Sequence, residues 1–289
     1  MSVREADLAT PTDEALAWLA SLPVNFWLAL AWIAVIILAA SLADALPLPS
    51  PTDMDMLAQR QAPSAAHWLG TDRLGRDMLA RLIYGARISL TVGVLAPLIG
   101  LMIGGLLGMV AGYVRGALET AIVATADVLL AFPPLVLALA VTAYLGPTLA
   151  NLTYIIGLLG IPAFTRVARA QTLAFANREF VLAARAMGAT ELRILWRELL
   201  PNVMLPLLAF FLLAVAITIV VEGALSFLGV GVPPPAPSWG SMIAEGRESL
   251  EIAPQIAFLP AVTMFLTVLS FNVVGDTLRL VTDPRQGTL

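Results

Sequence analysis

The chain has 289 residues, of which 59% are hydrophobic and 12% are charged, and its net charge is −4. Soluble domains are about 45 to 50% apolar, so this composition indicates a membrane protein. The chain has no lysine, no cysteine and one histidine, His67. The missing lysine excludes a standard P-loop and Schiff-base chemistry, and the missing thiols exclude thiolate metal sites. We therefore expect no cofactor, metal or catalytic residue in this chain, and an energy source elsewhere.

Apolar runs of about 20 residues predict six transmembrane helices in an all-α membrane protein. They lie at about 23–43, 88–113, 118–145, 149–164, 204–227 and 256–274. The expected organisation is an N-terminal segment at 1–22, a first transmembrane helix at 23–43, an external loop with an amphipathic helix at 44–87, a transmembrane domain at 88–280 and a tail at 281–289.

The loop between the fourth and fifth runs is rich in arginine. Positive charge marks cytoplasmic loops, so we expect this loop, and by parity both chain termini, to be cytoplasmic. The opening segment is acidic and has no small-residue cleavage site, so the first helix is expected to stay in the mature chain.

The second run carries glycines at a spacing of four, at Gly100, Gly104, Gly108 and Gly112. These positions share one helical face, which lets another backbone approach closely. We expect a helix-packing seam.

The charged block before the second run contains opposite charges four residues apart, such as Asp72 with Arg76 and Asp77 with Arg81. Together with an apolar line at the same spacing, this pattern predicts a helix on the outer membrane surface. It either anchors the second helix or docks another protein at the outer surface. His67 is expected to be a turn or interface residue.

Two carboxylates interrupt the apolar runs, Asp127 in the third and Glu222 near the end of the fifth. A carboxylate in a membrane span is costly unless it is paired or hydrated. Both are therefore candidates for lining or gating a pathway, with structural pairing as the alternative.

Residues 177–202 predict two short amphipathic helices. Asn177 is a good N-cap, Gly188 offers a left-handed stop, and Thr190 can cap the second helix. Phe180, Ala183, Ala184 and Met187 form one apolar stripe, and Leu192, Leu195, Trp196 and Leu199 form the other. Neither helix is long enough to cross a bilayer, so each needs a partner: the protein's own spans, the lipid interface or a cytoplasmic protein.

This segment resembles the cytoplasmic "EAA" loop of bacterial ATP-binding cassette (ABC) importer permeases. Ala183 and Ala184 match its alanines, Gly188 its glycine, and Leu200 with Pro201 its closing pair, while Leu182 and Glu198 depart from the pattern. The resemblance implies contact with an ATPase subunit. The residues expected to make it are Glu179, Ala183, Ala184, Arg185, Gly188, Ala189, Leu192, Leu195, Trp196, Leu200 and Pro201.

Four further blocks, at 67–90, 126–139, 222–246 and 275–285, are similar to the second permease subunit of dipeptide, oligopeptide and nickel importers. The resemblance implies the six-helix type I importer fold in a bacterial inner membrane. It also implies a homologous second permease, two ATPase subunits that bind ATP and Mg, a substrate-binding protein and lipid as partners, without nucleic acid. Peptides are the expected cargo, with nickel or other small solutes as the alternative. The rivals from other classes are an ion-coupled transporter that uses Asp127 and Glu222, and an intramembrane enzyme.

Overall fold

The structure is a computed structural model that describes residues 22–282. The expected N-terminal segment at 1–22 and the tail at 281–289 lie almost wholly outside the described residues. Apart from one isolated β-bridge between Thr71 and Asp77, the regular structure in the described part of the chain is helical. This confirms the expected all-α fold.

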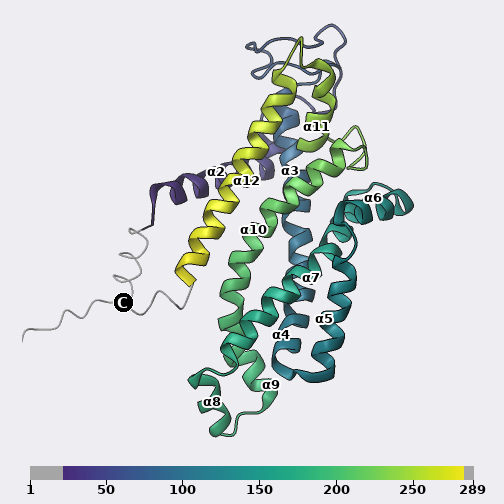
Figure 1. Ribbon diagram of the computed structural model, residues 1–289. Coiled ribbons are helices and arrows are strands. Elements are labelled where there is room, and N and C mark those ends of the chain that lie inside the picture. The colour runs from purple at the N-terminus through teal and green to yellow at the C-terminus, as the bar shows by residue number, and fades with distance from the viewer. Residues whose placement is uncertain (1–21, 283–289) are drawn as a thin grey trace, which may run out of the picture.

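The helices follow one another in the order shown in Figure 1. They are α2 (Val24–Ser41), η1 (Ala43–Ala45), α3 (Met78–Ile99), η2 (Gly100–Gly104), α4 (Gly105–Val114), α5 (Gly116–Leu130), α6 (Pro134–Leu145), α7 (Leu149–Phe175), α8 (Glu179–Ala186), α9 (Glu191–Arg193), η3 (Ile194–Leu199), α10 (Leu200–Phe227), α11 (Trp239–Gly246), η4 (Arg247–Ser249) and α12 (Gln255–Thr282).

Five of the described helical segments are long and apolar enough to cross a membrane, and the α5–α6 pair makes a sixth span if it is counted as one. Helices α3, α4, α7, α10 and α12 run lengthwise in the bundle, α2 crosses it, and α8 and α9 lie at one end with α11 at the other (Figure 1). The structure therefore has five candidate spans in its described part, or the expected six when α5 and α6 are counted together.

The second span begins earlier than expected. It runs without a break from Met78 to Val114, and Asp77 caps it by accepting a hydrogen bond from the Ala80 N–H. The prediction of a separate surface helix within 44–87 is therefore wrong. The Asp72 carboxylate accepts hydrogen bonds from the Leu74 and Arg76 N–H groups, and this local turn replaces helix just before the cap.

The third span was expected as one run at 118–145, but the structure divides it into the two helices α5 and α6. The axes of α5 and α6 differ by 80° across the break between them. Pro133 and Pro134 follow Phe132 there, and proline N atoms cannot continue the hydrogen-bond ladder. At 15 residues, α5 alone is about 22 Å long, which is shorter than a hydrocarbon core.

The glycine seam of the second span lies against α7. A Cβ atom on Gly104 would stand 2.4 Å from the Ile161 carbonyl oxygen, and one on Gly108 would stand 2.2 Å from the Thr165 carbonyl oxygen. Gly100 faces the Phe164 ring and Gly112 faces Arg169 and Thr172 in the same way. The two helices thus approach closely because the seam has no side chains.

The fourth and fifth spans extend past their expected limits. Helix α7 continues through Pro162 to Phe175, and the α9–η3–α10 segment runs unbroken from Glu191 to Phe227. Pro201 was expected to end a separate short helix, and it does not. Pro201 instead lies in the first turn of α10, where a proline without an N–H is tolerated, two residues after the π-helix at Ile194–Leu199 ends.

Candidate functional site

The segment between α7 and α10 projects from one end of the bundle as a turn followed by α8, a second turn and α9 (Figure 1). Gly188 has φ +83°, the left-handed conformation expected of a helix stop, and Thr190 caps α9 by accepting from the Arg193 N–H. The expected cap at Asn177 is wrong: the N-cap is Arg178, one residue later, and no side chain bonds there.

One set of apolar residues holds this segment together. Val181, Ala184, Ile194 and Leu199 are buried and form one cluster, with Ala189 and Leu195 packed against it. Tyr113 of α4 and Phe175 of α7 also contact the cluster. The buried set therefore joins α8 to η3 and attaches both to the transmembrane helices.

A second apolar set has no cover in the described structure. We call it the exposed apolar set: Phe180, Leu182, Met187, Leu192 and Trp196, exposed by 37%, 50%, 82%, 67% and 51%. It differs from the expected first stripe, because Ala184 turns inward while Leu182, absent from that stripe, turns outward. Exposed apolar patches mark sites that interact with a protein or a membrane.

Charged groups brace the segment against the end of α4. The Arg185 guanidinium donates to the Tyr113 hydroxyl at 3.2 Å and lies 3.4 Å from the Glu191 carboxylate, which the same hydroxyl also contacts. The Tyr113 hydrogen bond, followed by the charge of Glu191, raises the pKa of Arg185. Arg185 therefore stays charged and links α8, α9 and α4.

The other residues expected to make the ATPase contact differ in their exposure to solvent. Glu179, Ala183, Gly188 and Pro201 are exposed, and Leu200 is partly buried. Sequence reasoning missed Val181 and Ile194 of the buried set, and it missed Tyr113. Tyr113 carried no local signal because its partners are far along the chain.

Asp127 lies on α5 and pairs with Arg166 of α7 at 2.6 Å, while more than half of each side chain is exposed. Toward the start of α5, Glu119 pairs with Arg169 of α7 and with Arg115. These ion pairs join α5 to α7. The pairing that the sequence left open for Asp127 is thus present, alongside substantial exposure.

Glu222 lies on α10 and is 1% exposed, so it does not line an open surface. Its carboxylate accepts hydrogen bonds from the Ser89 hydroxyl of α3 at 3.0 Å and from the Ser226 hydroxyl at 2.7 Å. It forms no ion pair within the described part of the chain.

The charged block expected on the membrane surface is folded inward. Asp72, Arg76 and Arg81 are each at most 2% exposed, and both arginines donate to Glu245 of α11. His67 bonds Asp77 at 2.9 Å. Neither a simple anchoring rim nor an open docking face describes this arrangement.

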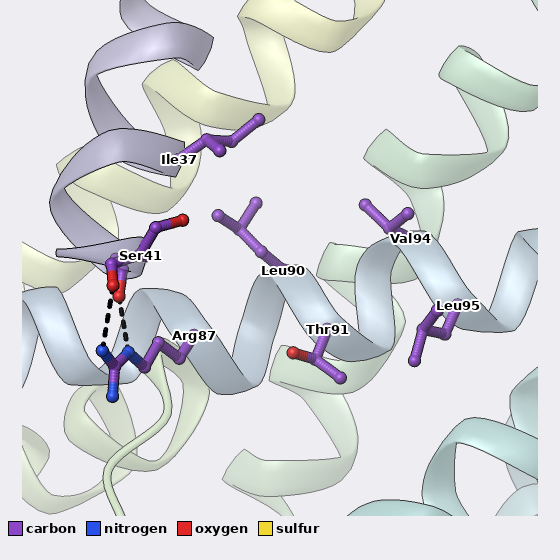
Figure 2. A pocket seen from close by; sticks show the side chains of 8 residues that line it. Ile37, Ser41, Arg87, Leu90, Thr91, Val94 and Leu95 are labelled. Atoms are coloured by element: carbon purple, nitrogen blue, oxygen red, sulfur yellow. Dashed lines mark hydrogen bonds between the residues drawn. The ribbon is translucent and has the colours of Figure 1, made fainter. Parts of the chain in front are cut away.

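A groove of about 450 Å³ separates the end of α2 from α3. Figure 2 shows Arg87 pointing toward α2, where it donates to the carbonyl oxygens of Ala40 and Ser41. It also pairs with Asp44 at 2.8 Å. The rest of the lining is mainly apolar, so the groove offers little to bind a polar ligand.

Comparison with known proteins agrees with this arrangement. Residues 104–288 match the family described as binding-protein-dependent transport system inner membrane component. The glutathione transport system permease protein GsiD of Pectobacterium atrosepticum is 42% identical over 233 residues, which is 81% of this chain and 77% of the relative. GsiD of Escherichia coli O6:K15:H31 is 46% identical over 77% of this chain and 74% of its own length.

A solved structure shares the fold. The chain aligns with one from inward-facing conformations of the MetNI methionine ABC transporter with TM-score 0.57 and 18% identity, covering 71% of this chain and 97% of that chain. The family match and the relatives together show that this protein belongs to the binding-protein-dependent transport system inner membrane components, the membrane-spanning permease subunits of ABC importers.

Proposed function

We propose that this permease imports short peptides, with glutathione-like tripeptides as the first cargo to test. The observation that carries the proposal is its identity of 42% and 46%, over most of its length, to permeases of glutathione transport systems. The chain pairs with a homologous permease, and the pathway forms between the two.

The exposed apolar set on α8, α9 and η3 is the contact with an ATPase subunit. A short amphipathic helix with an uncovered apolar face fits a groove on a partner protein. Two ATPase subunits bind ATP and Mg and do the chemistry, so this chain is not itself an enzyme. The segment between α7 and α10, which we call the coupling segment, is cytoplasmic, as are both termini, and α11 faces the substrate-binding protein outside.

Movement of the coupling segment reaches the membrane through a continuous helix. Because α9, η3 and α10 form one run of 37 residues, a displacement at Trp196 is passed directly to α10. The buried set and the Arg185 brace pass the same displacement to α4 and α7. Closure of the ATPase subunits on ATP thereby turns the pathway outward, and hydrolysis resets it.

The Asp127–Arg166 pair lines this pathway. Asp127 lies about 16 Å along α5 from Gly116, near the middle of a membrane about 30 Å thick. Exposed charges at such depth are costly toward lipid, so this face of α5 and α7 meets water instead. A carboxylate beside a guanidinium also complements the charged ends of a zwitterionic peptide.

Reconstitution tests the proposal. The chain is assembled with its second permease, ATPase subunits and binding protein in proteoliposomes, and uptake of labelled glutathione, a dipeptide and nickel is compared. We expect ATP-dependent uptake of glutathione or the dipeptide. Uptake of nickel alone, or uptake driven by a proton gradient without ATP, would overturn the proposal.

A further inference from the structure

The first turn of α11 is inserted between α3 and α10. Trp239 is fully buried, and its indole N–H donates to the Leu82 carbonyl oxygen of α3 at 3.0 Å. Gly240 lies so close to Gly223 of α10 that a Cβ atom on Gly240 would stand 2.5 Å from the Gly223 Cα atom. This end of α11 therefore has no room to slide while the contact holds.

Two chains of hydrogen bonds run from this turn to Glu222. In the first, the Trp239 N–H donates to the Ser89 hydroxyl, which donates to one carboxylate oxygen. In the second, the Ser241 N–H donates to Ser238, Ser238 to Ser226, and Ser226 to the other oxygen. Each hydroxyl receives a hydrogen from the α11 side and passes its own toward Glu222.

The direction of these bonds explains how the carboxyl group is held here with no ion pair to the residues that the structure describes. The N–H groups in the first turn of a helix are free donors that favour negative charge. The serine hydroxyls accept hydrogen bonds from these N–H groups, directly or through one another, and donate to both carboxylate oxygens of Glu222 on α10. The Ser226 hydrogen bond lies within α10, whereas the Ser89 bond and the links of both chains to α11 hold only while α3, α10 and α11 keep their present arrangement.

We infer that Glu222 is a positioning residue that holds the first turn of α11 between α3 and α10, and that stimulation by the binding protein requires this attachment. The second part rests on the proposed function. At its other end α11 is held separately, by Glu245 with Arg76 and Arg81. Loss of the Glu222 contacts therefore frees one end of α11 and leaves the other attached.

Thiol labelling of the purified complex tests the attachment without reference to cargo. The chain has no cysteine, so single cysteines report cleanly. Met242→Cys probes a site on α11 that is 2% exposed, and Leu250→Cys is the control at a site that is 44% exposed. We expect Glu222→Leu to raise the maleimide reaction rate at position 242 about tenfold and to leave position 250 unchanged, a factor that corresponds to about 1.4 kcal/mol.

Conservative variants show whether the hydrogen bonds of Glu222, and not only the volume of its side chain, hold α11 in place. The carboxamide introduced by Glu222→Gln offers one acceptor and one donor, so this variant keeps one hydrogen-bond chain and gives a smaller increase than Glu222→Leu. Ser89→Ala removes one chain and Ser226→Ala the other. Adding Ser89→Ala to Glu222→Leu is expected to change nothing further, because both act on one network. If Glu222→Leu fails to assemble, the two serine variants still give the answer.

Equal protection at position 242 in all variants would overturn the inference. In the same complexes, Glu222→Leu is expected to keep basal ATPase activity and lose stimulation by the binding protein. Retained stimulation would overturn the functional half. Failure of the unmodified complex to show any stimulated ATPase activity would instead contradict the proposed function, and the labelling result would stand by itself.

Discussion

Arg166 donates a hydrogen bond of 2.6 Å to Asp127, and 57% and 53% of the two side chains are exposed. The bond joins α7 to α5, and contact with lipid would penalise exposed charges of this kind. The exposed face of these two helices is therefore where water is expected.

Cysteine reactivity tests that expectation. Ala170→Cys lies one turn from Arg166 on the exposed face of α7, whereas Leu158 is 54% exposed on the same helix and serves as the control. The thiolate is the reactive form and needs water. We expect a charged, impermeant reagent to modify Ala170→Cys at least about tenfold faster than Leu158→Cys. Equal rates would mean that lipid or a packed partner covers the pair.

The glycine seam allows a paired test of close packing. Gly108→Ala places a Cβ atom 2.2 Å from a backbone oxygen of α7, whereas the Cβ atom of Gly105→Ala would be 3.6 Å from its nearest neighbour. Overpacking costs about 1 to 3 kcal/mol, and an unstrained Gly to Ala change in a helix gains up to about 1 kcal/mol. Thermal unfolding in detergent should show Gly108→Ala less stable than wild type and Gly105→Ala equal or more stable. The reverse order would exclude the seam.

Gly188 separates backbone strain from crowding, because a Cβ atom there would meet nothing within 4 Å while φ is +83°. Gly188→Ala is therefore expected to destabilise the turn between α8 and α9 by about 1 to 2 kcal/mol through conformation alone. Gly188→Asn should be milder, because asparagine tolerates this conformation. Hydrogen exchange of the α8 amides measures both. Equal exchange in wild type and Gly188→Ala would show that the turn does not need this conformation.

The contact at the end of α2 gives a prediction for titration. A hydrogen bond from Arg87 lowers the pKa of Asp44, with a smaller contribution from Tyr84. The carboxylate therefore favours the folded contact above its ordinary pKa, and this is lost as the pH falls through the lower folded value. Arg87→Gln should return the pKa of Asp44 toward its usual range, as followed by NMR. An unchanged pKa would assign the shift to other groups.

The sequence predicted features that depend on neighbouring residues. The left-handed Gly188, the Thr190 cap and the number of spans are local signals, and each agrees with the structure. The spacing of four between Asp72 and Arg76 also predicted a surface helix, but the Asp72 side chain forms a turn there with the backbone N–H groups that follow it.

Contacts between distant segments left no such signal. Asp127 with Arg166, Glu222 with Ser89, and Arg185 with Tyr113 each join residues that meet only in the folded chain. The helix is also continuous through Pro201 and contains a π-helix at Ile194–Leu199, neither of which propensity indicates. Sequence alone thus indicated the segment at 177–202 as the candidate contact with an ATPase subunit, and the structure divides its apolar residues into a buried and an exposed set.

Co-purification with the ATPase subunits tests most directly whether the exposed apolar set binds them. Trp196→Asp changes the exposed apolar set, and Leu57→Asp changes a residue that is 94% exposed in the loop before α3. Both put a charge on an exposed apolar position, and neither changes the buried set. We expect Trp196→Asp to lose the ATPase subunits and ATP-driven uptake and Leu57→Asp to keep both. Retention of the ATPase subunits and full uptake by Trp196→Asp would show that the exposed apolar set is not the contact.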